Sequence, residues 1–318
     1  MEQNRDRWVE KFIGDSFAEQ KRARRWGIFF KLLTFVYLFV AITLFMPSNF
    51  KTGPDEQAPH TALVVVKGVI ADGEAANANT IVAGLRKAFE AEHSKAVVMV
   101  INSPGGSPVQ SGFVYDEMWR LREKYPEKKL YAVITDLGAS GGYYMAAAAN
   151  DIYADKASLV GSIGVTASGF GFVGVMDKLG VERRHFTSGE HKAFLDPFSP
   201  IKDGESFFWQ QVLGSVHKQF IEVVLRGRGD RLKFTGEMDE KKMFSGLVWS
   251  GEQALELGLI DGLGSPGYVA REVIGMEEMV NYTVKPSPIE AIVRHLGVSI
   301  GRGAASSLGV SSDGLLLR

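Results

Sequence analysis

The longest apolar stretch of the chain lies near its N-terminus. Gly27 to Met46 carry a single charge, Lys31. At ~1.5 Å per residue, a helix of this length spans about 30 Å, the hydrocarbon thickness of a bilayer. The basic cluster Lys21 to Arg25 predicts that the N-terminal side stays in the cytoplasm. We therefore expect a cytoplasmic segment over residues 1–26 and a transmembrane helix over residues 27–47.

Two other interpretations of this stretch are a cleaved signal peptide and a buried core helix. A signal peptide has a shorter apolar region of ~7–15 residues, followed by a small-residue cleavage site. Met46 to Phe50 offer no such site, and a core helix would not need the preceding basic cluster. An uncleaved anchor is therefore favoured. Residues 48–60 are polar and contain two prolines, which predicts a linker.

Beyond the linker, apolar strand-like runs alternate with stretches of helical periodicity. Strands are predicted at residues 62–70, 96–101, 130–135, 151–154 and 158–165, and helices at 79–92, 108–124, 143–149 and 205–226. A capping box, Ser250 to Gln253, opens a further helix that should end near Gly258. This order predicts an α/β domain over residues 61–285, with a largely parallel sheet covered by helices. Residues 286–318 are rich in Gly and Ser and are predicted to form a C-terminal tail.

Composition narrows the function classes. The chain has 318 residues, 36 Lys and Arg, 37 Asp and Glu, and no cysteine. A net charge of −1 argues against a nucleic-acid binder that relies on a broad basic surface. The absence of cysteine removes disulfides, cysteine nucleophiles and thiolate metal sites. No HExxH motif or phosphate-binding loop occurs, so neither a metal nor a cofactor is expected.

A candidate nucleophile follows the third predicted strand. Gly138-Ala139-Ser140-Gly141-Gly142 fits G-x-S-x-G, a strand-to-helix turn that exposes a reactive serine. Small neighbours allow a substrate carbonyl to approach the backbone, whose N–H groups can stabilise an oxyanion. The motif is short, and a tight turn with Ser140 as the helix N-cap explains it equally well.

A serine nucleophile needs a base, for which the sequence offers His and Lys candidates. None of the six histidines has a context that marks it as a triad member. Lys192 is followed by apolar and proline residues that can form a desolvated pocket, although a solvated loop lysine is the default interpretation. The turn Ser103 to Gly106 can supply a second oxyanion donor, or can be a simple turn.

Five segments in this order resemble the signal peptide peptidase A family, the S49 serine peptidases. The resemblance covers roughly residues 62–264 and rests on VINSPGGS, TDLGASGGYYMAAAAND, LVGSIGV, TSGEHKAFLDPF and WSGEQALELGLIDGLG. It implies a ClpP/crotonase-like spiral fold around a parallel sheet. It also implies Ser140 as nucleophile, Lys192 as general base, Ser162 as the residue that orients the lysine, and Gly106 and Gly141 as oxyanion donors.

The resemblance further implies a protease that degrades cleaved signal peptides and other membrane-associated peptides. Short members of the family resemble ring-shaped homo-oligomers, often octamers, in which Ser and Lys come from adjacent subunits. With the anchor at residues 27–47 in the bilayer, we expect a single-pass protein of the inner (plasma) membrane whose catalytic domain is periplasmic or extracellular. Nucleic acid is not an expected partner.

Three competing functions remain open on the residues alone. An esterase of the α/β-hydrolase type explains G-x-S-x-G but requires a His–Asp pair. A non-catalytic membrane scaffold explains the anchor and the fold. An acyl-CoA enzyme of the crotonase type shares the fold but needs no Ser/Lys pair.

Overall fold

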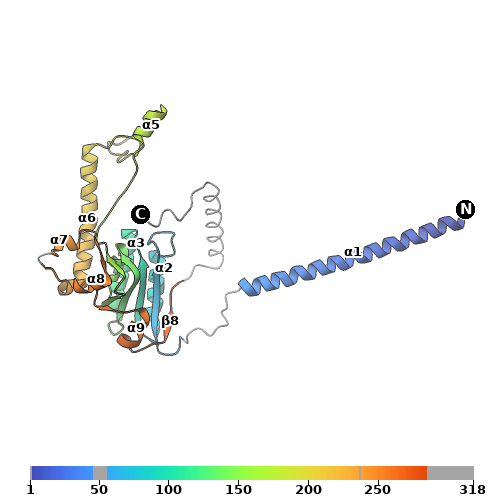
Figure 1. The fold of residues 1–318 in the computed structure, drawn as a ribbon, viewed down its shortest axis with the longest axis horizontal. Coiled ribbons are helices and arrows are strands. Elements are labelled where there is room, and N and C mark those ends of the chain that lie inside the picture. Colours follow the sequence, from blue (N-terminus) through green and yellow to red (C-terminus); the bar gives the residue numbers. More distant parts are fainter. Residues whose placement is uncertain (1, 46–55, 236–237, 285–318) are drawn as a thin grey trace. The chain divides into compact units, whose positions relative to one another are not determined.

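The computed structural model describes residues 2–45, 56–235 and 238–284 (Figure 1). The predicted tail at 286–318 and most of the predicted linker, residues 48–55, lie outside the described residues. The chain divides into two compact units, Met1–Gly53 and Pro54–Arg318.

The N-terminal unit contains one continuous helix, α1 (Glu2–Phe45). The helix therefore extends back through the charged segment that precedes the apolar stretch, where Glu, Lys, Arg and Ala favour helix. Glu19–Ile42 is the one described helical stretch that is long and apolar enough to cross a membrane, with a mean hydropathy of 1.7. None of it is buried by the protein, and Trp26 stacks on Phe30 at 5.7 Å near its basic end.

The second unit alternates strands with helices. The strands are β1 (His60–Lys67), β2 (Ser94–Ser103), β3 (Leu130–Ala139), β4 (Asp151–Ala154), β5 (Leu159–Gly161), β6 (Val248–Ser250), β7 (Gly262–Leu263) and β8 (Met279–Asn281). The helices are α2 (Ala78–Glu90), α3 (Pro108–Lys124), α4 (Gly141–Ala146), α5 (Val173–Leu179), α6 (Asp203–Arg228), α7 (Glu240–Met243), α8 (Gly251–Glu256) and α9 (Pro266–Tyr268), with shorter turns η1 (Gly229–Arg231) and η2 (Val269–Ile274).

The eight strands form one sheet, in which β6-β5-β3-β2-β1-β8 is the main path. Every pairing is parallel except that of β5 with β6. The predicted α/β fold with a largely parallel sheet is confirmed. Parallel neighbours need helical crossovers, which explains the alternation of strands and helices along the sequence.

On the side away from β2, strand β3 pairs with two different strands, one along each half of its length. Its first half, Tyr131 to Ile134, pairs with β4, which in turn pairs with β7. Its second half, Leu137 to Ala139, pairs with β5, which pairs with β6. The sheet thus opens at the C-terminal end of β3, where parallel sheets place their binding sites.

Apolar side chains fill both faces of the sheet. The main core joins one face to α2, α3 and α4, whose buried residues include Leu85, Met118 and Tyr143. A smaller cluster on the other face joins Val98 and Val133 to Val269 of η2. Strands buried on both sides read as continuous apolar runs, which is the pattern seen in the sequence.

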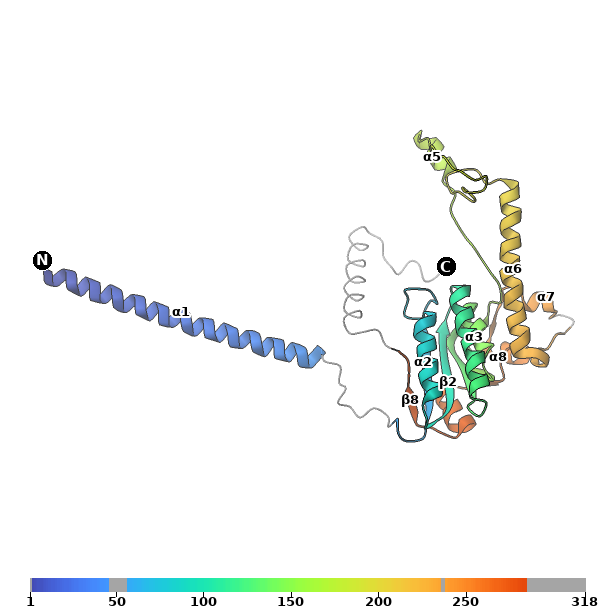
Figure 2. The same ribbon diagram turned by 180° about the vertical axis from the view of Figure 1, so that it is seen from behind.

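Helix α6 carries a long segment away from the sheet. Residues 165–202, here called the excursion, lie between the turn that follows β5 and the start of α6, and they include α5. Both views show α5 at the end of α6 that is remote from the sheet (Figures 1 and 2). The predicted strand at 158–165 is accordingly only Leu159–Gly161, because the backbone leaves the sheet after it.

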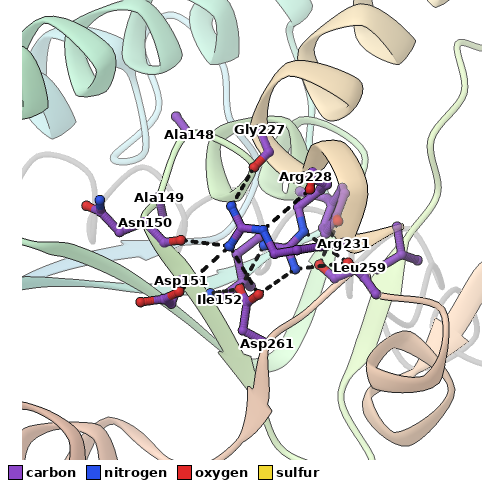
Figure 3. A network of polar contacts seen from close by, with 12 residues as sticks. Ala148, Ala149, Asn150, Asp151, Ile152, Gly227, Arg228, Arg231, Leu259 and Asp261 are labelled. Atoms are coloured by element: carbon purple, nitrogen blue, oxygen red, sulfur yellow. Dashed lines mark hydrogen bonds and ion pairs between the residues drawn. The ribbon is translucent and has the colours of Figure 1, made fainter. Parts of the chain in front are cut away.

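The opposite end of α6 is fixed by a buried arginine (Figure 3). Arg228 donates to both carboxylate oxygens of Asp261, at 2.7 and 2.9 Å, and to the Gly258 carbonyl. Asp261 also accepts from the Ile152 amide at 2.7 Å and from Arg231 at 3.1 Å. Burial opposes ionisation of Asp261, but the hydrogen bonds and charge of Arg228 outweigh it and lower its pKa. The network ties α6 to β4 and to the turn before β7.

The predicted boundary between the linker and the first strand differs from the observed one. His60, which the sequence indicates as the end of the linker, is fully buried at the start of β1. Its Nδ1 donates to the Ala58 carbonyl at 2.8 Å, and its Nε2 accepts from the Tyr282 hydroxyl at 2.9 Å. Tyr282 is more than 200 positions away, so a pairing of this kind leaves no signal in the local pattern.

Candidate active site

Ser140 occupies a sharp turn between β3 and α4. Its backbone angles are φ 51° and ψ −123°, a conformation that residues with a side chain rarely adopt. Its hydroxyl makes no capping hydrogen bond to α4, so the simple N-cap interpretation of the motif does not describe it. The Ser140 amide donates to the Gly161 carbonyl at 2.8 Å, which joins the turn to β5. Such strain is characteristic of functional turns, and this geometry agrees with a nucleophile elbow.

The loop after β2 packs directly on this turn. Gly105 has φ +94°, and a Cβ there would lie 2.6 Å from the Gly141 nitrogen and 2.7 Å from the Ser140 Cβ. A Cβ on Gly141 would lie 3.4 Å from the Gly106 nitrogen. Only a residue without a side chain allows this backbone-to-backbone contact.

The contact brings two backbone amides together beside Ser140. Gly141 is the first residue of α4, where amide groups have no partner within the helix. Among the described residues, neither the Gly141 amide nor the Gly106 amide donates to another protein group. Two N–H groups beside a serine can stabilise a developing oxyanion.

One cavity of about 940 Å³ contains four of the five predicted site residues. Gly106, Ser140, Gly141 and Ser162 all line it. Ser162 follows β5 and has φ +53°. Besides Ser140 and Ser162, one other non-glycine residue of the described sequence has a positive φ, so two of the three strained positions lie in this cavity.

Lys192 is not in this cavity. It is exposed in a turn of the excursion, where its amide donates to the Gly189 carbonyl at 3.2 Å. Nearby Phe194 packs on Phe208 and Trp209, in the first turns of α6. His217, one of the α6 residues that line the cavity, lies eight residues beyond Trp209, or roughly 12 Å along the helix. The desolvated pocket expected around Lys192 is therefore absent from the described part of a single subunit.

Sequence reasoning did not identify the side chains that complete the cavity. Its apolar wall comes from α3, α4 and α6, through Val109, Phe113, Tyr144, Val216 and Phe220. His217 and Asp116 line it as well. The α3 and α6 residues recur at helical spacing, a pattern that does not distinguish a buried face from a cavity wall. No group of three His, Asp or Glu side chains in the described residues can hold a metal ion.

Comparison with known proteins gives a consistent result. The sequence profile of peptidase family S49 matches residues 122–277. A Methanocaldococcus jannaschii protein named as a protease is 30% identical over 221 residues, which cover 67% of this chain and 68% of that protein. An Enterococcus faecium protein named as the signal peptide peptidase SppA is 32% identical over 210 residues, covering 63% of this chain and 58% of that protein.

A Brucella abortus relative carries a different name. It is called Na(+)/H(+) antiporter NhaA and is 42% identical over 191 residues, or 60% of this chain. The match spans only 25% of that protein's length, so the match gives no reason to describe this chain as an antiporter. The elbow, the sheet that carries it and the matches to proteases agree: the chain belongs to peptidase family S49, the family of the type A signal peptide peptidases.

Proposed function

We propose that the protein is a membrane-anchored serine endopeptidase with a Ser140/Lys192 dyad that degrades cleaved signal peptides. The strained turn at Ser140 is the observation that carries the proposal, because it places Ser140 in the cavity wall beside two amides that have no partner among the described residues. A serine in this setting lacks only a base. The resemblance to family S49 is what supports Lys192 for that role.

In the proposed reaction, neutral Lys192 Nζ removes the proton from Ser140 Oγ, which attacks the carbonyl carbon of the scissile peptide. The amides of Gly106 and Gly141 donate to the resulting oxyanion. The C–N bond then breaks, and Lys192 returns its proton to the leaving amine. Water, deprotonated by Lys192, attacks the acyl-enzyme and releases the acid together with free Ser140.

The base is proposed to come from a neighbouring subunit of a homo-oligomer. Lys192 is exposed on the excursion, and its own α6 separates it from the cavity of its own subunit. The excursion also exposes large apolar side chains, including Phe170 at 82% and Phe186 at 93%. Docking on a second copy would cover these side chains and desolvate Lys192, which lowers the pKa of an amine.

The proposed substrates follow from the cavity and the anchor. Phe113 and Val109 form an apolar, accessible edge of the cavity, which suits the apolar core of a signal peptide. The exposed apolar face of Glu19–Ile42 supports insertion in a bilayer with the N-terminus in the cytoplasm. The catalytic unit would then stand on the face of the inner membrane where cleaved signal peptides are released.

Cleavage of a synthetic signal peptide by the purified full-length protein in detergent tests the proposal. Ser140→Ala and Lys192→Ala should each abolish cleavage, while Lys178→Ala, an exposed lysine of the same excursion, should retain it. Turnover in Ser140→Ala at the wild-type rate would exclude the serine mechanism. Retention of activity in Lys192→Ala alone would exclude the lysine as base and reopen the esterase-type His–Asp alternative.

Mixed oligomers test the position of the base. Ser140→Ala subunits retain Lys192, and Lys192→Ala subunits retain Ser140, so co-assembled subunits should regain part of the activity that each variant lacks. Mixtures that stay inactive despite verified co-assembly would place both groups of the dyad in one subunit.

A further inference from the structure

His217 is the histidine of α6 that reaches the Ser140 cavity. It is half-buried, and its Nε2 lies 3.1 Å from the Ile163 carbonyl oxygen. Because a carbonyl only accepts, Nε2 must carry the hydrogen and donate it. This assignment follows from the geometry of the contact. Both the Nε2–H tautomer and the protonated ring have this hydrogen, so the bond persists in either state.

The hydrogen bond from His217 holds the carbonyl of Ile163, the residue that follows Ser162. The Gly161 carbonyl accepts from the Ser140 amide, and the Ser162 amide donates to the Leu247 carbonyl at 2.8 Å. The Ile163 carbonyl accepts from His217. Gly161, Ser162 and Ile163 are therefore each held by a hydrogen bond to a different part of the chain. A strained backbone of this kind persists only when its surroundings hold it.

These three bonds differ in one respect. The first two join backbone groups along β5, whereas the third depends on a single side chain of α6. Ile163 itself is fully buried in the folded chain, where His217 donates to its carbonyl. Without His217, the backbone that follows Ser162 loses its anchor, just before it enters the excursion that carries Lys192.

We propose that His217 is a positioning residue that holds the Ser162 hydroxyl toward the reacting groups in the cavity. This inference rests on the proposed function, in which Ser162 orients the general base. Because Nε2 carries the hydrogen that is donated to Ile163, a general-base role of His217 would have to use Nδ1, and the substitutions below test that alternative. Asp116, which also lines the cavity, is exposed on α3.

Three substitutions of His217 in the full-length protein separate positioning from other roles. A Gln amide nitrogen reaches the position of Nε2, whereas an Asn amide nitrogen reaches only that of Nδ1. His217→Gln should therefore keep kcat within about threefold of wild type, while His217→Asn and His217→Leu should lose about tenfold, with KM little changed. Lys218→Gln, on the exposed side of α6, is the matched control and should not change kcat.

A double-variant cycle with Ser162→Gly tests whether His217 acts through Ser162. Gly relieves the positive φ and removes the hydroxyl, so adding His217→Leu should lower kcat by less than about twofold further. Full additivity would overturn the proposal, as would loss of activity in His217→Gln equal to that in His217→Leu. A thousandfold loss in all three variants would instead identify His217 as the base.

Two controls separate this inference from other failures. Unfolding temperatures of each variant distinguish mispositioning from loss of fold, and His217→Gln keeps the test valid if His217→Leu is unstable. If wild type shows no Ser140-dependent cleavage, the proposed function fails. If wild type cleaves and His217→Asn matches it in kcat, only the role of His217 fails.

Discussion

Replacement of Arg228 by Met is expected to destabilise the catalytic unit while leaving the cavity residues in place. The Arg228 side chain is completely buried and makes a bidentate pair with Asp261, whose side chain is 17% exposed. Met fills a similar volume but donates no hydrogen bond. The Asp261 carboxylate and the Gly258 carbonyl then lose their Arg228 donors.

The expected loss follows from these contacts. Removing one partner of a buried ion pair costs about 3–5 kcal/mol, because the other charge stays buried. Asp261 keeps the Ile152 amide and Arg231, which places the cost near the lower limit, at about 3 kcal/mol. By contrast, Arg184 and Glu182 are each 75% exposed, and an exposed pair contributes less than about 1 kcal/mol.

Urea unfolding followed by tryptophan fluorescence measures both effects. Arg228→Met should lower the free energy of unfolding by about 3 kcal/mol, and Arg184→Met by less than about 0.5 kcal/mol. Asp261→Asn in the Arg228→Met background should recover part of the loss, because it removes the unpaired charge. A loss below about 1 kcal/mol in Arg228→Met, or no recovery in the double variant, would refute this account of the network.

Two further predictions concern the pH dependence of stability and the packing of the elbow. Hydrogen bonds led by that from Arg120 outweigh burial and lower the pKa of Glu117 from 4.5 to about 2. A carboxyl whose pKa is depressed by folding stabilises the protein above the unfolded pKa, and this stabilisation is lost as the pH falls toward the folded pKa. Glu117→Gln should therefore be less stable than wild type at pH 7, with a difference that shrinks between pH 4.5 and 2 in acid unfolding curves; a constant difference would contradict the assignment. Gly105→Ala should lower kcat by about a hundredfold, because its Cβ would displace the Gly141 amide, and misplacements of about 1 Å have effects of this size. The helical Gly214→Ala, which meets nothing within 4 Å, is the control, and equal activity of the two variants would contradict the packing argument.

Local sequence patterns identified most of the fold. The helix at 108–124 and the strand at 151–154 are observed with the predicted ends, because a proline opens the helix and polar residues flank the strand. The capping box at Ser250 is also observed. The division of β3 between β4 and β5 was not predicted, because it depends on which strands meet and not on the character of any one strand.

The candidate site was predictable to the extent that it lies on turns. The turns of Gly106, Ser140 and Ser162 each follow a strand, and parallel strands bring their ends to one edge. His217 reaches the same cavity from a helix that follows the long excursion, and its context in the sequence is that of an ordinary helical residue. The separation of Lys192 from the cavity is likewise invisible locally, because it depends on the direction in which α6 leaves the sheet.

Covalent labelling of Ser140 tests the central claim most directly. Wild-type protein treated with a fluorophosphonate probe and digested for mass spectrometry should carry one adduct, on the peptide that contains Ser140. The rate of labelling should fall sharply in Lys192→Ala. Absence of an adduct on Ser140, or labelling of Lys192→Ala at the wild-type rate, would contradict the Ser140/Lys192 dyad.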